Sequence, residues 1–129
     1  MNNFPHPDEI DKELLSHLEE ASNLVCKWIA ESRIQGPLPK SISIPEIFPD
    51  DEPYSRSKLF SDIERIMKGG YQPSHPGALA HLDPPPLSAS IVGDLICAAM
   101  NNNLLAEELS PTLTKLERNL CEWVASRLG

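Results

Sequence analysis

The sequence has 129 residues, enough for one modest domain, and 40% of them are hydrophobic. The 19 acidic residues outnumber the 11 basic ones, and the resulting net charge of −8 argues against binding to nucleic acid or to anionic lipid. No apolar run reaches the roughly 18 residues of a membrane span, and the acidic, polar N-terminus does not resemble a signal peptide. We therefore expect a cytoplasmic protein that binds neither nucleic acid nor membranes.

The first predicted helix spans about residues 8–32. Asp8 is expected to cap its N-terminus, and Gly36-Pro37 follows its end. Apolar residues three and four positions apart form one stripe along this helix: Ile10, Leu14, Leu18, Ala21, Val25 and Trp28. A helix that is this long and amphipathic needs a surface to pack on.

A proline-rich segment separates the first helix from the second. Residues 37–53 contain five prolines and are interpreted as an extended linker. Ser55 is then expected to cap a helix over residues 56–67, which Gly69-Gly70 would end.

The next segment, residues 71–86, follows neither a helical nor a strand pattern. It contains five prolines, two histidines and one carboxylate. Long ordered loops of this kind are often functional.

Two more helices are predicted in the C-terminal third. The helix over residues 87–101 is apolar nearly all round, so we expect it to be buried on more than one side. The last helix begins at Ser110-Pro111, a favourable cap followed by proline at the first helical position. Apolar helical patterns also contain the three cysteines, which we interpret as reduced core thiols: Cys26, Cys97 and Cys121.

Several residues allow alternative chemical interpretations. His75, His81 and Asp83 include the ligand types of a two-histidine, one-carboxylate metal site, although their spacing matches no standard pattern. Ser88 could join His81 and Asp83 in a catalytic triad, but no nucleophile elbow is present. The asparagines at 101–103 could contact a ligand with their amides. The simpler explanation is that they end the preceding helix, which asparagine favours. The sequence contains no GxGxxG, P-loop, CxxC or HExxH motif, so nucleotide, structural zinc and zincin sites lack their minimum residues.

A more specific signal lies in the run HPGALAHLDPPP that starts at His75, followed by SASIVGDLICAAMNNN and by SPTLTKLE from Ser110. Together with Trp123 and the final Leu-Gly, this run resembles the N-terminal part of the pyridoxal-phosphate-dependent group II decarboxylases. That family includes aromatic amino acid, glutamate, histidine and diaminobutyrate decarboxylases. The resemblance covers about residues 70–129.

The resemblance implies a homodimeric enzyme that acts on an amino acid and carries pyridoxal 5'-phosphate. The family's cofactor-binding lysine, the aspartate at the ring nitrogen and the stacking histidine all lie downstream, so this chain is expected to contain no catalytic or cofactor-binding residue and to bind no cofactor alone. Its implied substrate-binding residues lie in the loop: His75, His81, Leu82, Asp83 and Pro84. The turn from Asn103 to Leu105 would reach the active site of the neighbouring subunit.

The sequence departs from many family members at residues 77–79, which are Gly-Ala-Leu where aromatic side chains are common. With His81 and Asp83 in place of aromatic walls, the pocket would suit a small or polar amino acid better than an aromatic one, which we take as a hypothesis. The expected fold is mainly α, with amphipathic helices and proline-rich loops, like the start of a fold type I enzyme without its large α/β cofactor domain. The expected divisions are an N-terminal helix (1–36), a linker (37–54) and a helical segment (55–129) that contains the substrate loop 71–86. The alternative function is a stand-alone helical interaction or dimerisation module.

Overall fold

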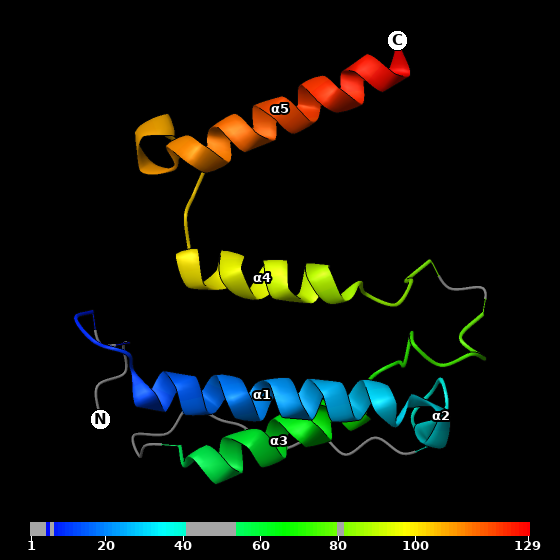
Figure 1. The fold of residues 1–129 in the computed structure, drawn as a ribbon. Coiled ribbons are helices and arrows are strands. Elements are labelled where there is room, and N and C mark those ends of the chain that lie inside the picture. Colours follow the sequence, from blue (N-terminus) through cyan, green and yellow to red (C-terminus); the bar gives the residue numbers. More distant parts are fainter. Residues whose placement is uncertain (1–4, 6, 41–53, 80–81) are drawn as a thin grey trace. The chain divides into compact units, whose positions relative to one another are not determined.

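The computed structural model describes residues 5, 7–40, 54–79 and 82–129 (Figure 1). These residues form helices and no strand, which confirms the mainly α class. In chain order the elements are α1 (Lys12–Ala30), α2 (Ser32–Gln35), α3 (Arg56–Lys68), α4 (Ser88–Met100), the 3-10 helix η1 (Glu107–Leu109) and α5 (Pro111–Leu128). They fall into a first compact unit, Met1–Pro85, and a second, Pro86–Gly129. Among the helices of the described ranges, none is long and apolar enough to cross a membrane.

Helix α1 begins at Lys12, and its cap is Asp11, so the prediction that Asp8 caps it was wrong. The Asp11 carboxylate accepts a hydrogen bond from the Leu14 backbone N–H at 2.8 Å, which satisfies one of the donors left open in the first helical turn. The predicted cap of α3 is confirmed, since the Ser55 hydroxyl accepts from the Lys58 backbone N–H at 3.3 Å. Most of the linker, residues 41–53, lies outside the described residues.

Helices α1 and α3 lie side by side in the first unit (Figure 1). Arg56, the first residue of α3, bonds across to α1 through its guanidinium, at 2.6 Å to the Ser16 hydroxyl and 2.9 Å to the Glu20 carboxylate. The guanidinium also lies 5.8 Å from the ring centroid of Phe60. The ring centroid of His17 on α1 lies 5.7 Å from the same Phe60 centroid. Phe60 is 8% exposed and is the one apolar side chain buried among the described residues. The core of this unit is therefore small and centred on a single aromatic ring.

Glu64 of α3 lies between two lysines. Its carboxylate is 2.9 Å from the Lys68 ammonium and 3.5 Å from that of Lys27 on α1. The hydrogen bond from Lys68 and its charge, with a smaller contribution from Lys27, hold the pKa of Glu64 below its ordinary value. A carboxyl group whose pKa is lowered by folding stabilises the fold at pH values above its ordinary pKa. This contribution is lost as the pH falls through the lowered pKa.

We expect Glu64→Gln to lower the melting temperature of the first unit at neutral pH but much less in acid. The reason is that protonation removes the same charge from the wild-type side chain. Thermal unfolding of both proteins between neutral pH and pH values below the ordinary glutamate range measures this difference. Lys68→Met serves as the matched control, because it should remove most of the pH dependence while keeping Glu64. A wild-type advantage that stays constant in acid would contradict the assignment.

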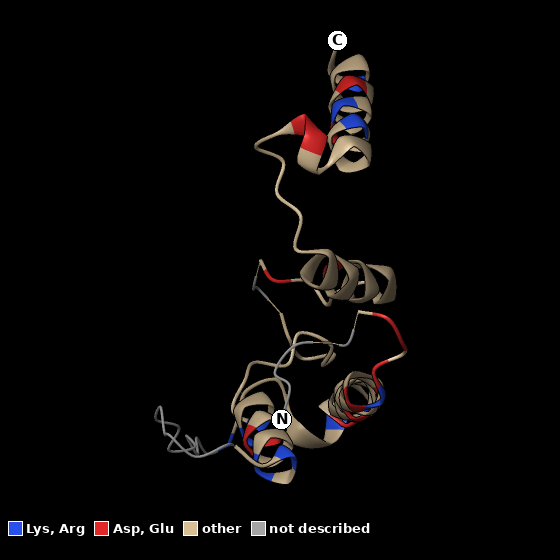
Figure 2. Cartoon of the chain, turned by 90° about the vertical axis from the view of Figure 1, so that its left-hand side faces the viewer, with Lys and Arg blue, Asp and Glu red and all other residues tan. Residues whose placement is uncertain are grey.

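Helix α4 in the second unit matches its predicted bounds to within one residue, but not its predicted burial. None of its residues is buried, and Val92, Leu95 and Ile96 are each about half exposed. Asp94 is its one charged residue, so the helix is almost entirely tan in Figure 2, with no blue. The apolar residues of α4 therefore form a surface that no described residue of this chain covers.

Helix α5 begins at Pro111 as predicted and packs on η1, where the Arg118 guanidinium lies 3.0 Å from the Glu107 carboxylate. Ser110 precedes the helix as expected, but its side chain forms no capping hydrogen bond. The Ser110 hydroxyl is instead buried, because η1 folds against the first turn of the helix.

The interpretation of the three cysteines as core thiols was wrong. Cys26, Cys97 and Cys121 are all free thiols, but each is exposed. Their helices are rich in apolar residues, yet α1 and α4 bury no residue fully and α5 buries only Thr114. Apolar spacing identified the helices correctly but did not show how much of their surface is covered.

Candidate functional site

The loop that carries the predicted substrate contacts begins with a hydrogen-bonded turn around His75. The His75 N–H donates to the Gln72 carbonyl at 3.1 Å, and the His75 carbonyl accepts from the Ala78 N–H at 2.9 Å. The backbone N–H of Gly77 also donates to Nδ1 of the His75 ring at 2.8 Å. Because Nδ1 is an acceptor here, the proton of the neutral ring lies on Nε2. The half-buried His75 thus offers one N–H donor, Nε2, in a fixed orientation.

Gly77 fits closely against this ring. A Cβ atom at residue 77 would lie 3.0 Å from Nδ1 and 3.1 Å from Cε1 of His75. A larger side chain would therefore require the imidazole to shift.

The start of the loop is anchored to both long helices of the first unit. The Gln72 side-chain N–H donates to the Trp28 carbonyl of α1 at 2.7 Å, and the Gln72 backbone N–H donates to the Pro37 carbonyl at 3.0 Å. Trp28 in turn donates its indole N–H to the Met67 carbonyl of α3 at 2.8 Å. No sequence pattern indicated a role for Gln72, because a single glutamine in a proline-rich segment carries no periodic signal.

The other predicted loop residues are exposed. Leu82 is 98% exposed, and Asp83 and Pro84 are also exposed. All three belong to the same unit as His75. His81 lies outside the described residues, so the suggested metal set and the suggested triad, both of which include it, remain untested. Within the described ranges, no group of three or more histidine, cysteine, aspartate or glutamate residues could hold a metal ion.

The second predicted contact segment forms a turn in the second unit. The Asn103 side-chain oxygen accepts from the Leu105 backbone N–H at 3.2 Å, and Leu105 is 95% exposed. Asn101 adopts the left-handed conformation at φ 46° and ends α4, with its N–H donating to the Cys97 carbonyl at 3.0 Å. Helix termination is therefore confirmed for Asn101, while Asn103 shapes the turn that presents Leu105.

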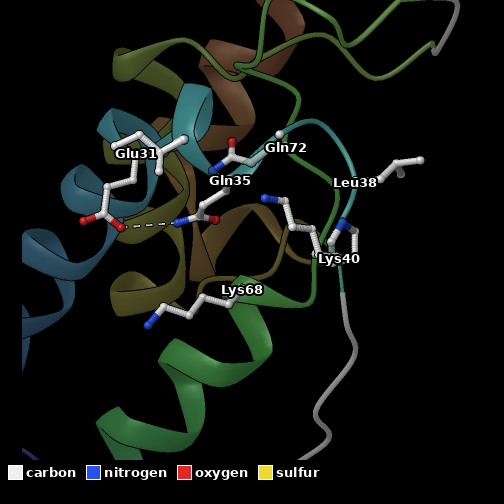
Figure 3. A pocket seen from close by; sticks show the side chains of 10 residues that line it. Glu31, Gln35, Leu38, Lys40, Lys68 and Gln72 are labelled. Atoms are coloured by element: carbon white, nitrogen blue, oxygen red, sulfur yellow. Dashed lines mark hydrogen bonds between the residues drawn. The ribbon is translucent and has the colours of Figure 1, made fainter.

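A cavity of about 330 Å³ opens beside the anchor in the first unit (Figure 3). Glu31, Gln35, Lys40, Lys68 and Gln72 line it together with the apolar side chains of Ile34 and Leu38. Gln35 donates its amide to the Glu31 carboxylate at 3.3 Å, as the dashed line in Figure 3 shows. Two of the charged side chains in the wall are thus engaged, Glu31 by Gln35 and Lys68 by Glu64. We assign no chemistry to this cavity.

Comparisons with known proteins find relatives that match most of this chain. Residues 39–129 match the family model described as the pyridoxal-dependent decarboxylase conserved domain. Histidine decarboxylase of Homo sapiens is 31% identical over 121 residues, which cover 85% of this chain and 18% of that protein. Histidine decarboxylase of Rattus norvegicus is 30% identical over 122 residues, which cover 86% of this chain and 18% of that protein. The chain thus spans less than a fifth of the length of these relatives.

Proposed function

Because the chain belongs to the pyridoxal-dependent decarboxylase family, we propose that it is the N-terminal segment of an amino acid decarboxylase and is incomplete for catalysis by itself. The observation that carries this proposal is the family match over residues 39–129, which include the substrate-loop motif and both predicted contact segments. The family's cofactor is pyridoxal phosphate, which serves as an electron sink when bound.

On the resemblance, this chain contributes no residue to the site of that cofactor. Such a site needs a lysine that is available to react, together with a carboxylate at the ring nitrogen and a cradle for the phosphate. Lys27 and Lys68 are both paired with Glu64, and the Lys58 ammonium lies 4.5 Å from the Tyr54 ring centroid. Together with the resemblance, these contacts support a cofactor site made of residues outside this chain, and we derive no catalytic step from it.

We assign the chain a role in binding and orienting the substrate. His75 would offer its Nε2 proton as a hydrogen-bond donor, while Leu82, Asp83 and Pro84 would form part of the pocket wall. His81 is included in this proposal on the resemblance alone. Leu105, held by the turn at Asn103, would project into the active site of a second subunit.

The exposed apolar helices support a role in assembly. Apolar side chains that are half exposed or more lie along both α4 and α5: Val92, Leu95, Ile96, Leu116, Leu120, Trp123 and Leu128. Monomeric proteins rarely leave contiguous apolar surfaces of this extent uncovered. We propose that these faces are buried against a second copy in a homodimer or against the remainder of the decarboxylase polypeptide.

Histidine is the first substrate to test. The relatives described above are named histidine decarboxylases, and the polar side chain of histidine agrees with a loop that carries Asp83 and lacks aromatic residues at 77–79.

The test begins with the natural polypeptide in its source cells. An antibody against this segment should detect a protein several times heavier than 14.3 kDa. After purification, that protein should show the absorbance of bound pyridoxal phosphate and release CO₂ from an amino acid, with histidine, glutamate and aromatic amino acids compared side by side. His75→Ala should lower kcat/KM at least tenfold, as expected for loss of an oriented donor.

Two outcomes would contradict parts of this proposal. A natural product of 14.3 kDa without cofactor would exclude the decarboxylase segment and favour the alternative, a stand-alone helical interaction module. A larger protein that decarboxylates with unchanged kcat/KM after His75→Ala would retain the family activity but remove the role of His75.

A further inference from the structure

Gln72 is the most deeply buried side chain among the described residues, at 1% exposure, although it is polar and lies in a proline-rich segment. It follows α3 by four residues and precedes His75 by three. A polar side chain is buried at a cost unless it forms hydrogen bonds, so the bonds that Gln72 forms indicate its purpose.

Gln72 joins three parts of the first unit. Its side-chain N–H donates to the Trp28 carbonyl in the last turn of α1. Its backbone N–H donates to Pro37, beyond the short helix α2. The side-chain oxygen accepts no hydrogen bond from the described residues, so the donor Nε2 makes the specific side-chain contact.

The Gln72 carbonyl is also the first acceptor of the loop. It accepts from His75, and the series continues with Gly77 N–H on the His75 ring, Ala78 N–H on the His75 carbonyl and Leu79 N–H on the Gly77 carbonyl at 3.0 Å. Residues 73 and 76 are prolines and have no N–H to contribute. Few backbone donors remain in this stretch, and those of residues 72, 75, 77, 78 and 79 all form hydrogen bonds.

We propose that Gln72 is a positioning residue, which fixes the start of the substrate loop to α1 and thereby sets where His75 lies. This inference rests on the proposed function, because the loop binds a substrate only if the chain is part of a decarboxylase. Gln72 acts through His75 and does not itself touch the substrate. A glutamine is suited to this position because its N–H reaches the Trp28 carbonyl, whereas methionine has a similar shape but no donor.

Hydrogen–deuterium exchange of the natural polypeptide tests the anchor without requiring catalysis. Gln72→Met should raise the exchange rate of peptides covering residues 74–79 at least tenfold, while peptides from α1 keep their wild-type rate. Gln35→Met is the matched control, since Gln35 lines the same cavity but bonds only to Glu31 among the described residues (Figure 3). Equal loop exchange in both variants would overturn the proposal.

Steady-state kinetics of the same enzyme tests the consequence for the substrate. Gln72→Met should raise KM for the amino acid at least fivefold and change kcat less than twofold, with unchanged cofactor absorbance. Faster loop exchange without a change in KM would overturn the positioning role. A wild-type polypeptide that does not decarboxylate would contradict the proposed function instead, and the exchange comparison would still decide whether Gln72 anchors the loop.

If Gln72→Met also loosens α1, the variant has unfolded the unit. Gln72→Asn then replaces it, because it keeps the carboxamide but withdraws it by one methylene from the Trp28 carbonyl. The same exchange pattern is expected, and wild-type loop exchange in Gln72→Asn would count against the proposal.

Discussion

Replacing Phe60 with alanine is expected to destabilise the first unit by about 3 kcal/mol, the usual cost of removing a buried aromatic side chain. Phe60 lies under the Arg56 guanidinium and beside the His17 ring, between α1 and α3. Since domains are stable by only about 5–15 kcal/mol, the loss would be a large part of what holds these two helices together.

Tryptophan fluorescence can follow this unit separately. The 129-residue segment has two tryptophans, Trp28 in the first unit and Trp123 in the second, so urea unfolding of this segment produced by itself, in a Trp123→Phe background, reports on the first unit. Leu59→Ala is the matched control, because Leu59 is the neighbouring residue on α3 but is 38% exposed. We expect it to cost under about 1 kcal/mol. Equal losses in both variants would mean that Phe60 is not the centre of the core.

Replacing Leu120 with aspartate should weaken self-association of the natural polypeptide at least tenfold. Leu120 lies on the apolar face of α5 and is 59% exposed within this chain. If that face packs against a second copy, the change removes an apolar contact and buries an unpaired charge, and a tenfold loss of affinity corresponds to about 1.4 kcal/mol. Molar mass as a function of concentration, measured by light scattering or sedimentation, would show the dissociation.

Asn119→Asp is the control for this experiment, because it adds the same charge at the adjacent, exposed and polar position of α5. It should leave the mass unchanged. If Leu120→Asp lowers the melting temperature but not the mass, the face packs within one polypeptide and the dimer interface lies elsewhere. If neither property changes, the apolar face of α5 has no role in assembly.

The secondary structure was largely predictable because its signals are local. Apolar spacing, the Ser55 cap and the glycines after residue 68 depend on neighbours within one or two helical turns, and the structure confirms the elements that they predict. The prediction failed where two local signals competed. Asp8 and Asp11 are both acceptable caps by residue type. In the structure Asp11 is the cap, because its carboxylate accepts a hydrogen bond from the backbone N–H of Leu14 in the first turn.

The candidate site was predictable only in part. The motif at His75-Pro76 identified the loop, and the resemblance indicated the chemistry around it. The partners of His75 were not predictable, because the ring orientation depends on the Gly77 backbone and on Gln72. Gln72 in turn is fixed by Trp28, which lies 44 residues earlier in the chain.

The sequence alone determined the helical class, the order of the helices and the family resemblance, since all three follow from residue types at short, fixed spacings. Only the tertiary structure decided which apolar residues are covered and which polar residues are buried. Burial depends on contacts between distant segments, and the same apolar spacing is compatible with a core or with an interface. This is why Phe60 and Gln72 are buried, whereas most apolar residues of α4 and α5 remain exposed in this chain.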